Sequence, residues 1–305
     1  MKIRLIHLFA VLTVSSLAAC AGIPPHEYLP APARDRIATT DVVVPIRQSE
    51  IYVYVPPSTA GATGGAAFGI VGALVGAMVD ASVNSVRTSK AEAAVKPLRD
   101  SLVDYSFDTS LQGDLKASLG QVSFLNVADV HEVKDVTDDA LDAALTGSKQ
   151  GAVLFATADY HLSNDGDVLY VTVAASLFAN NDALRALKAP QSKPPRTSLK
   201  NALYHNTLVF ETKIPGATSD RDHNIAGWSA DNGAAMRGAL DTGARELAAM
   251  LAADIRRSES DGVDPPGAVT ATLENQTGTV LGSDDNGSIL RFKDGTLKFA
   301  AKSVL

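Results

Sequence analysis

Cysteine and tryptophan are nearly absent from this chain of 305 residues, which contains one of each, Cys20 and Trp228. A single cysteine excludes a disulfide framework within the chain. The chain also lacks the spaced histidine, cysteine, serine and glycine signatures of zinc proteases, redox proteins, serine hydrolases and phosphate-binding loops. The sequence therefore predicts no catalytic residues, no metal site and no cofactor.

Basic residues are also fewer than acidic residues. Lys and Arg number 27 against 34 Asp and Glu, which gives a formal net charge of -7. An acidic balance argues against nucleic acid as a partner, and against anionic lipid as a general partner. Hydrophobic residues make up 46% of the chain and aromatic residues only 6%, which is typical of a folded, alanine-rich protein.

The segment 1–19 has the pattern of a secretory signal peptide. Lys2 and Arg4 precede an apolar run over residues 5–14, and small residues follow it. That run is too short to span a membrane as a mature helix. The segment ends in the letters LAAC at residues 17–20, which are similar to a bacterial lipobox. The alternative is an ordinary signal peptide followed by a chance cysteine.

The lipobox resemblance implies that Cys20 is a lipidation site. In that family the thiol receives a diacylglycerol, the chain is cut before the cysteine, and the new amine is acylated with a fatty acid such as palmitate. Several acyl chains anchor a protein firmly. The next residue is Ala21 rather than aspartate, and the family's sorting rule then implies the outer membrane, with the soluble domain facing the periplasm. We interpret residues 20–40, which contain four prolines, as a lipidated, semi-extended tether reaching roughly 60 Å.

Residues 60–79, AGATGGAAFGIVGALVGAMV, carry no charge and consist mostly of glycine and alanine. Read as a helix, one narrow face of this segment carries four glycines: Gly65, Gly69, Gly72 and Gly76. Each glycine costs a helix roughly 1 kcal/mol against alanine, so this face suggests that something packs very closely on it. We interpret the segment as a glycine-zipper helix within an insertion at residues 60–87. It mediates packing with itself, the bilayer or a partner, or alternatively packs within its own domain.

Hydrophobic periodicity predicts an α+β domain over residues 41–257 and a small β unit over residues 268–305. The expected strands are at residues 42–44, 51–55, 122–130, 152–162, 168–178, 204–214, 269–273, 278–281, 288–292 and 296–300. The expected helices are at residues 98–119, 137–145 and 230–255. Ser89 and Glu92 have the spacing of a capping box, and Pro97 suits the first position of a helix. These elements predict a mostly antiparallel sheet flanked by helices, with the small β unit packed on the domain because it buries little core alone.

The order of these elements is similar to that of the curli-secretion lipoprotein and TolB N-terminal group, over residues 49–256. The letters GAVLFATADY at residues 151–160 resemble the strand that precedes a hairpin in that group, without its clean motif. The zipper is similar to glycine-zipper outer-membrane lipoproteins, for which the resemblance implies no particular activity.

These resemblances imply a non-enzymatic lipoprotein of the bacterial outer membrane. It would contact the membrane through its anchor, and its zipper would mediate membrane contact, homo-oligomerisation or binding of an envelope protein. The alternative is a subunit of an oligomeric envelope channel or secretion machine. A third hypothesis, an envelope hydrolase, has no supporting constellation of residues in the sequence.

The remaining polar residues of interest have simpler interpretations. His161 and His205 lie on expected strands and are interpreted as surface or hydrogen-bonded structural residues. The run at residues 219–223, SDRDH, is more typical of a solvated loop than of a metal site. Residues 284–287 form a turn rather than a calcium loop, since the glutamate at the twelfth loop position is missing. Trp228 is interpreted as a packing anchor.

Overall fold

The computed structural model describes residues 26–46, 48, 50–55, 85–188, 196–258, 267–274 and 276–304. The predicted signal peptide, Cys20 and the zipper segment at residues 60–79 lie outside these residues. The interpretations of that part of the chain therefore stay predictions.

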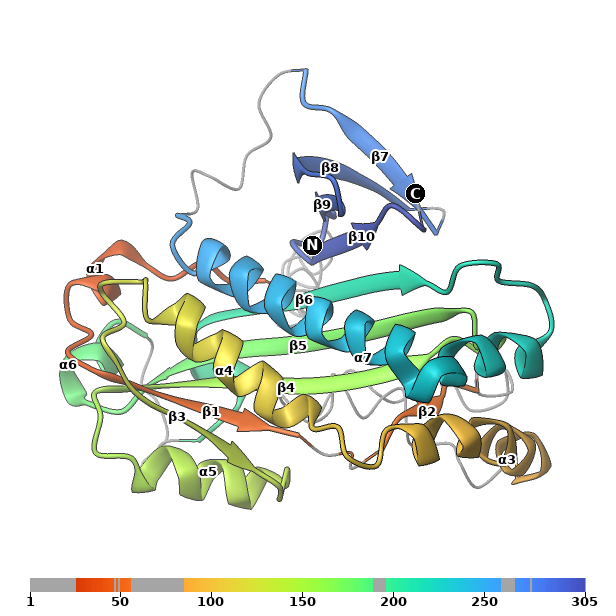
Figure 1. Ribbon diagram of the computed structural model, residues 1–305. Helices are drawn as coiled ribbons and strands as arrows, with labels where there is room; N and C mark the ends of the chain where they lie inside the picture. The colour runs from red at the N-terminus through yellow and green to blue at the C-terminus, as the bar shows by residue number, and fades with distance from the viewer. Residues whose placement is uncertain are drawn as a thin grey trace, which may run out of the picture.

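In the described part of the chain, ten strands form one sheet (Figure 1). The strands run in the spatial order β3-β1-β4-β5-β6-β10-β9-β8-β7, and β2 pairs with β4 beside that path. Their bounds are β1 Thr40–Pro45, β2 Tyr52–Val53, β3 Val127–Val133, β4 Ala152–Leu162, β5 Val168–Ala179, β6 Ala202–Lys213, β7 Thr270–Leu273, β8 Gln276–Ser283, β9 Gly287–Arg291 and β10 Leu297–Ala301. The expected strands are confirmed with two exceptions: the one at residues 122–130 begins later, at Val127, and the one at residues 51–55 is reduced to Tyr52–Val53.

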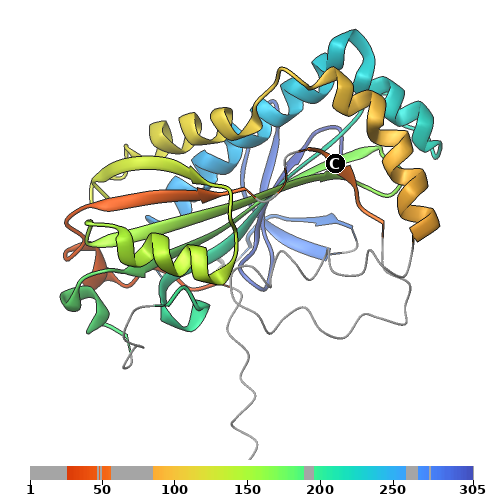
Figure 2. The ribbon, with the colours of Figure 1, turned by 90° about the horizontal axis from the view of Figure 1, so that it is seen from below.

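Helices cover both faces of the sheet (Figure 2). The described helices are α1 Ala31–Arg34, α3 Ser85–Ser101, α4 Phe107–Leu119, α5 Asp138–Gly147, α6 Asp182–Arg185 and α7 Arg221–Asp254, with a 3-10 helix at Leu199–Asn201. α3, α4 and α7 lie on one face, over the main hydrophobic core. α5, capped by Thr137, packs Leu141 and Leu145 against Phe155 and Phe178 on the other face.

The expectation of a mostly antiparallel sheet is wrong, because the sheet is mixed. β1 pairs in parallel with β3 and β4, β2 pairs in parallel with β4, and β10 pairs in parallel with β6. The β4–β5–β6 meander and the pairs among β7, β8, β9 and β10 are antiparallel. Parallel neighbours need long crossover connections, which the chain provides through α3 and α4, through α5, and through α7.

The single helix expected at residues 98–119 is also wrong, because two helices occupy this region. α3 runs through Ser89 and carries Pro97 in its interior, so neither residue begins a helix. The chain leaves α3 at Ser101, and Ser106 begins α4 by accepting a hydrogen bond from the Thr109 N–H. α4 then buries Leu111, Leu115 and Leu119, as the spacing of these leucines predicts.

α7 is the longest helix and contains a break. Asp231, Asn232 and Gly233 have positive φ values of 49°, 58° and 72°. Residues 221–229 therefore form a first half of α7 that is set apart from the longer second half. The second half carries the predicted apolar stripe, with Met236, Leu240, Ala244, Leu247, Leu251 and Ile255 all buried.

Residues 26–40, which the sequence analysis assigned to a tether, pack against the folded body instead. Leu29, Ala33 and Ile37 are buried. Glu27 forms a backbone bridge with His205 near the start of β6, with N–H to carbonyl distances of 2.8 and 3.2 Å. The physical reason is that the proline-rich segment carries an apolar residue every fourth position, and these residues fill the end of the main core.

The C-terminal strands continue the main sheet. Leu297–Ala300 of β10 lies in parallel register with Leu208–Glu211 of β6, and Phe299 stacks on Phe210 with ring centroids 5.6 Å apart. A smaller cluster around Leu273, Leu290 and Phe292 fills the space between the outer strands. This unit therefore joins the main sheet through the edge of β6.

Candidate functional site

A row of side chains crosses the sheet in register and gathers its titratable groups. Tyr52 of β2 pairs with His161 of β4, His161 with Tyr170 of β5, and Tyr170 with Glu211 of β6. The His161 ring lies between the two tyrosine rings, 5.3 Å from Tyr52 and 5.4 Å from Tyr170, with interplanar angles of 27° and 25°. This cross-strand row is the densest polar feature of the sheet and is our first candidate site.

Asp159 holds one end of the row in place. Its carboxylate accepts a 2.8 Å hydrogen bond from His161 Nδ1 and a bond from the Tyr52 hydroxyl at 3.1 Å. Burial and the neighbouring Asp159 charge raise the pKa of Tyr52 well above its usual range. The hydroxyl therefore stays protonated at neutral pH and acts only as a donor. Because both donors converge on one carboxylate, His161 is the hydrogen-bonded structural residue that the sequence predicts.

Lys298 holds the other end of the row. Its ammonium lies 2.9 Å from Glu211 Oε2 and 2.8 Å from Glu274 Oε2, and Tyr170 donates a 2.6 Å bond to Glu274. Burial lowers the pKa of Lys298, but the hydrogen bonds that its ammonium donates to both carboxylates outweigh burial, and the net shift of the pKa is upward. Burial dominates at Glu211 and raises the pKa of its carboxyl group. This ion-pair network joins the meander to the C-terminal strands.

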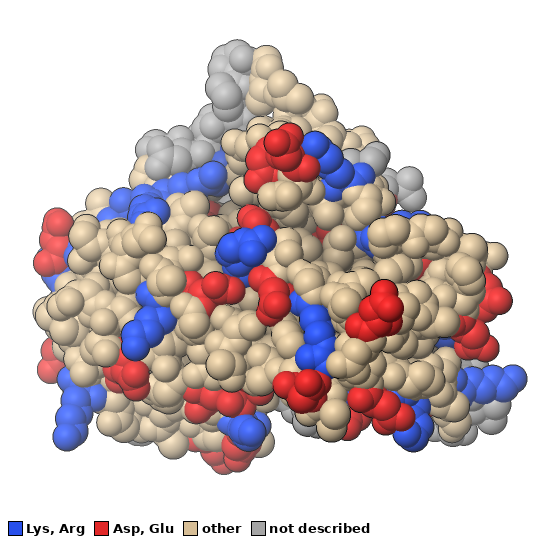
Figure 3. Space-filling model, viewed as in Figure 1, with Lys and Arg blue, Asp and Glu red and all other residues tan. Residues whose placement is uncertain are grey.

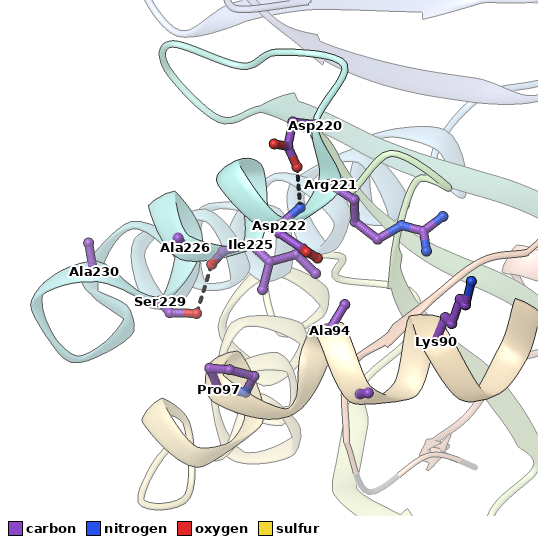
Figure 4. Close-up of a pocket in the computed structure, with 11 residues that line it drawn as sticks. Lys90, Ala94, Pro97, Asp220, Arg221, Asp222, Ile225, Ala226, Ser229 and Ala230 are labelled. Carbon is purple, nitrogen blue, oxygen red and sulfur yellow. Dashed lines mark hydrogen bonds between the residues drawn. The ribbon is translucent and has the colours of Figure 1, made fainter.

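A groove of about 870 Å³ runs between α3 and the first half of α7 and is the second candidate (Figure 4). Its walls are built mostly from small side chains, with Ala94 and Pro97 of α3 facing Ile225 and Ala226 of α7. Charged residues line one end: Lys90, Asp220, Arg221 and Asp222. Mixed charge at one end and alanine along the walls suit a helix or an extended chain better than a small polar metabolite.

The β4–β5 hairpin turn fixes one wall of this groove. Arg221 Nε donates to the Asn164 carbonyl at 2.5 Å, Asn224 Nδ2 to the Asp165 carbonyl at 2.8 Å, and Trp228 Nε1 to the Gly166 carbonyl at 2.9 Å. The three donors lie three and four residues apart, so they share one face of the helix. Trp228 is thus the buried packing anchor that the sequence predicts.

A smaller hollow of about 250 Å³ lies under the corner between α3 and α4. Phe107, Tyr160 and Leu240 form its apolar side, and the Phe107 and Tyr160 rings are 4.7 Å apart. Arg99 lines it too, but its guanidinium already pairs with Glu92 at 2.6 Å and with Glu50 at 3.3 Å. The hollow therefore offers little charge to a ligand.

The sequence-predicted loops have structural roles. Asp220 accepts hydrogen bonds from the N–H groups of Asp222 and His223, so the run at residues 219–223 begins α7. Asp284 accepts from the N–H groups of Asn286 and Gly287 and closes the β8–β9 turn. Within the described residues, no cluster of three metal-ligating side chains forms.

The zipper glycines and Cys20 cannot be placed relative to these features, since they lie outside the described residues. The cross-strand row and the groove were missed by sequence reasoning. The row joins residues from four separated strands, so only the register shows it. The alternation of apolar and polar residues in each strand can be read from the sequence, but the sequence does not show which strands are neighbours in the sheet.

Comparison with known proteins adds no family to these observations. No protein-family model matches the chain. No curated protein matches it either. Among the described helices, none has both the length and the apolar character needed to cross a bilayer.

Proposed function

We propose that this protein is a non-enzymatic lipoprotein of the bacterial outer membrane. Cys20 carries its lipid anchor, and the zipper segment at residues 60–79 mediates membrane contact or association with another protein. The soluble body faces the periplasm. The proposal needs no catalytic group from the body. The titratable side chains of the cross-strand row bond to one another and so join neighbouring strands, with Asp159 and Lys298 each bound to two partners.

One observation carries the proposal: the two described elements that flank the zipper segment in the sequence, β2 and α3, contact each other directly. Arg99 Nε donates to the Ile51 carbonyl at 2.7 Å. Residues 56–84 therefore lie between two elements that described contacts already join. We infer that the segment takes a role outside the body, since a ridge of glycines suits close helix packing.

Crosslinking in intact cells, followed by identification of the captured chains and sizing in mild detergent, tests this function. We expect a membrane-bound protein whose crosslinks pass through residues 60–79, to itself or to another envelope protein. A large closed ring would support the channel subunit instead. A soluble, monomeric protein with no crosslinks through the zipper would contradict the proposal.

A further inference from the structure

The folded body begins very close to the proposed anchor. His26 is six residues after Cys20, and six extended residues span at most about 20 Å. His26 is held by the body, since its side chain is 6% exposed and its Nε2 lies 3.5 Å from Asp254 Oδ2. A lipid at Cys20 would thus keep this end of the molecule at the bilayer surface.

Four arginines gather at this end, which we call the anchor-proximal surface: Arg34, Arg36, Arg256 and Arg257. Arg34 donates to the Arg257 carbonyl, which brings α1 and the end of α7 together. Arg256 donates to the Gln121 carbonyl at 3.0 Å, and Arg36 to the Ala183 carbonyl at 3.1 Å. In Figure 3, basic side chains gather at the upper left, over the C-terminal end of α7.

None of these four arginines forms an ion pair with a described carboxylate. Five arginines elsewhere do so: Arg99, Arg185, Arg196, Arg237 and Arg245. The hydrogen-bond acceptors of Arg34, Arg36 and Arg256 are neutral carbonyls, which do not cancel the guanidinium charge. Arg221, at the β4–β5 turn, also donates only to Asn164, so what sets the four arginines apart is that they lie together at the end nearest the proposed anchor.

Two of these guanidinium groups also carry unsatisfied donors. Arg34 lies over the Phe124 ring, 5.5 Å from its centroid. Arg34 Nε and Arg257 Nη1 are buried and have no hydrogen-bond partner. A buried charged donor without a partner is costly, and an oxyanion at the surface would offset the charge of both groups. Guanidinium matches phosphate oxygens with paired N–H donors.

We propose that the anchor-proximal surface binds the anionic headgroups of the membrane that holds the Cys20 lipid. This inference rests on the proposed lipid anchor and adds the orientation of the body. The start of β6 and the end of α7 face the headgroups. β2 lies at the other end of the sheet. Tyr52 pairs with His161 of β4, whereas Glu27 pairs with His205, His205 with Ser176, and Ser176 with Phe155, six residues earlier on β4. Six residues of a strand are about 20 Å, so the zipper insertion leaves the body away from the anchored end.

The test uses the mature chain with Cys20→Ala, so that no lipid contributes. It is sedimented with vesicles of phosphatidylcholine alone or mixed with phosphatidylglycerol, with inorganic phosphate as a soluble competitor. We expect binding only to the anionic vesicles, weakening as salt is raised. Replacing the four arginines by glutamine should reduce binding by ~tenfold or more, while millimolar phosphate should compete weakly.

The matched control removes the same charge elsewhere, with Lys96, Lys134, Arg196 and Arg245 changed to glutamine. Because Arg34 also packs on Phe124, the double variant Arg36→Gln, Arg256→Gln keeps the test valid if the fourfold variant unfolds. Equal binding to neutral vesicles, or equal loss in the control, overturns the proposal. Membrane fractionation of the wild-type protein is scored separately. A wild-type protein bound to the membrane, with a Cys20→Ala chain that ignores anionic vesicles, would reject this inference and leave the proposed function standing.

Discussion

Trp228 Nε1 donates a 2.9 Å hydrogen bond to the carbonyl oxygen of Gly166, and the indole is only 2% exposed. This contact ties the first half of α7 to the turn between β4 and β5. The break at residues 230–233 separates that half from the rest of the helix, so the turn is the main support for one wall of the groove.

Trp228→Phe should lower the free energy of unfolding by ~1–3 kcal/mol, because the Gly166 carbonyl loses its buried donor. Urea unfolding followed by circular dichroism measures the change. Val103→Ala, at an 87% exposed position, is the control and should stay within about 0.5 kcal/mol of wild type. Equal midpoints for Trp228→Phe and wild type would show that the bond is dispensable.

Gly166→Ala should destabilise by ~1–2 kcal/mol, because φ is +68° and the added Cβ would lie 3.2 Å from Ile225 Cγ1. Gly113→Ala is the matched control. It lies inside α4 with nothing within 4 Å of the added Cβ, so it should stabilise by up to ~1 kcal/mol. The same denaturation assay compares the two, and a shift of the same sign in both would refute the geometric argument.

Asp254 should make folding sensitive to acid. Burial raises the pKa of its carboxyl group, but contacts from His26, Asn206 and Tyr204 outweigh burial and the net shift is downward. A carboxyl group whose pKa is lower in the folded state stabilises the fold above about pH 4 and loses that contribution as pH falls through the folded value. Asp254→Asn should therefore lower stability at pH 7 and flatten its decline below pH 4, as measured by thermal unfolding across pH. An unchanged acid slope would exclude this carboxylate as the cause.

Cys20→Ala should leave the precursor unprocessed or release the protein from the membrane, because the only thiol in the chain is then lost. Fractionation of cells with a size comparison on gels measures both effects. Recovery of this variant at mature size in the outer-membrane fraction would disprove the anchor.

Gly69→Leu and Gly72→Leu should each disrupt association, because a close approach of two backbones leaves no room for the added side chain. Phe68 lies on the other side of the same predicted helix, so Phe68→Ala should weaken lipid contact while pairing between helices persists. The yield of crosslinked oligomer decides between them. Unchanged oligomers in both glycine variants would show that the ridge is not a seam between molecules.

The sequence predicted the elements of this fold better than their arrangement. Strand Ala152–Leu162 matches its predicted bounds, because a mostly apolar run followed by Asn164 to Asp167 is a strong hairpin signal. The parallel pairs of β1 and β10 were missed, since parallel neighbours are joined by crossovers whose destination no local pattern records. Pro97 misled the helix assignment because α3 continues through it instead of beginning there.

The charged features were less visible in the sequence. Arg34 and Arg257 are more than two hundred positions apart and meet only through the packing of α1 on the end of α7. Composition likewise concealed the anchor-proximal surface, because a net acidic count says nothing of where the basic residues gather. The expected tether failed for a related reason. Its prolines were interpreted as the sign of an extended tether, and the regular spacing of Leu29, Ala33 and Ile37, which indicates packing, was not considered.

The parallel pairing of β10 with β6 sets the order in which this chain can finish folding. β6 is an interior strand, and the edge it shares with β10 stays open while α7 and strands β7 to β9 are synthesised. The turn at Gly295, just before β10, then closes on His26 near the other end of the chain. Such distant contacts slow folding. A chain that must cross a membrane before it folds would benefit from this delay, because its sheet cannot be completed until the late strands arrive.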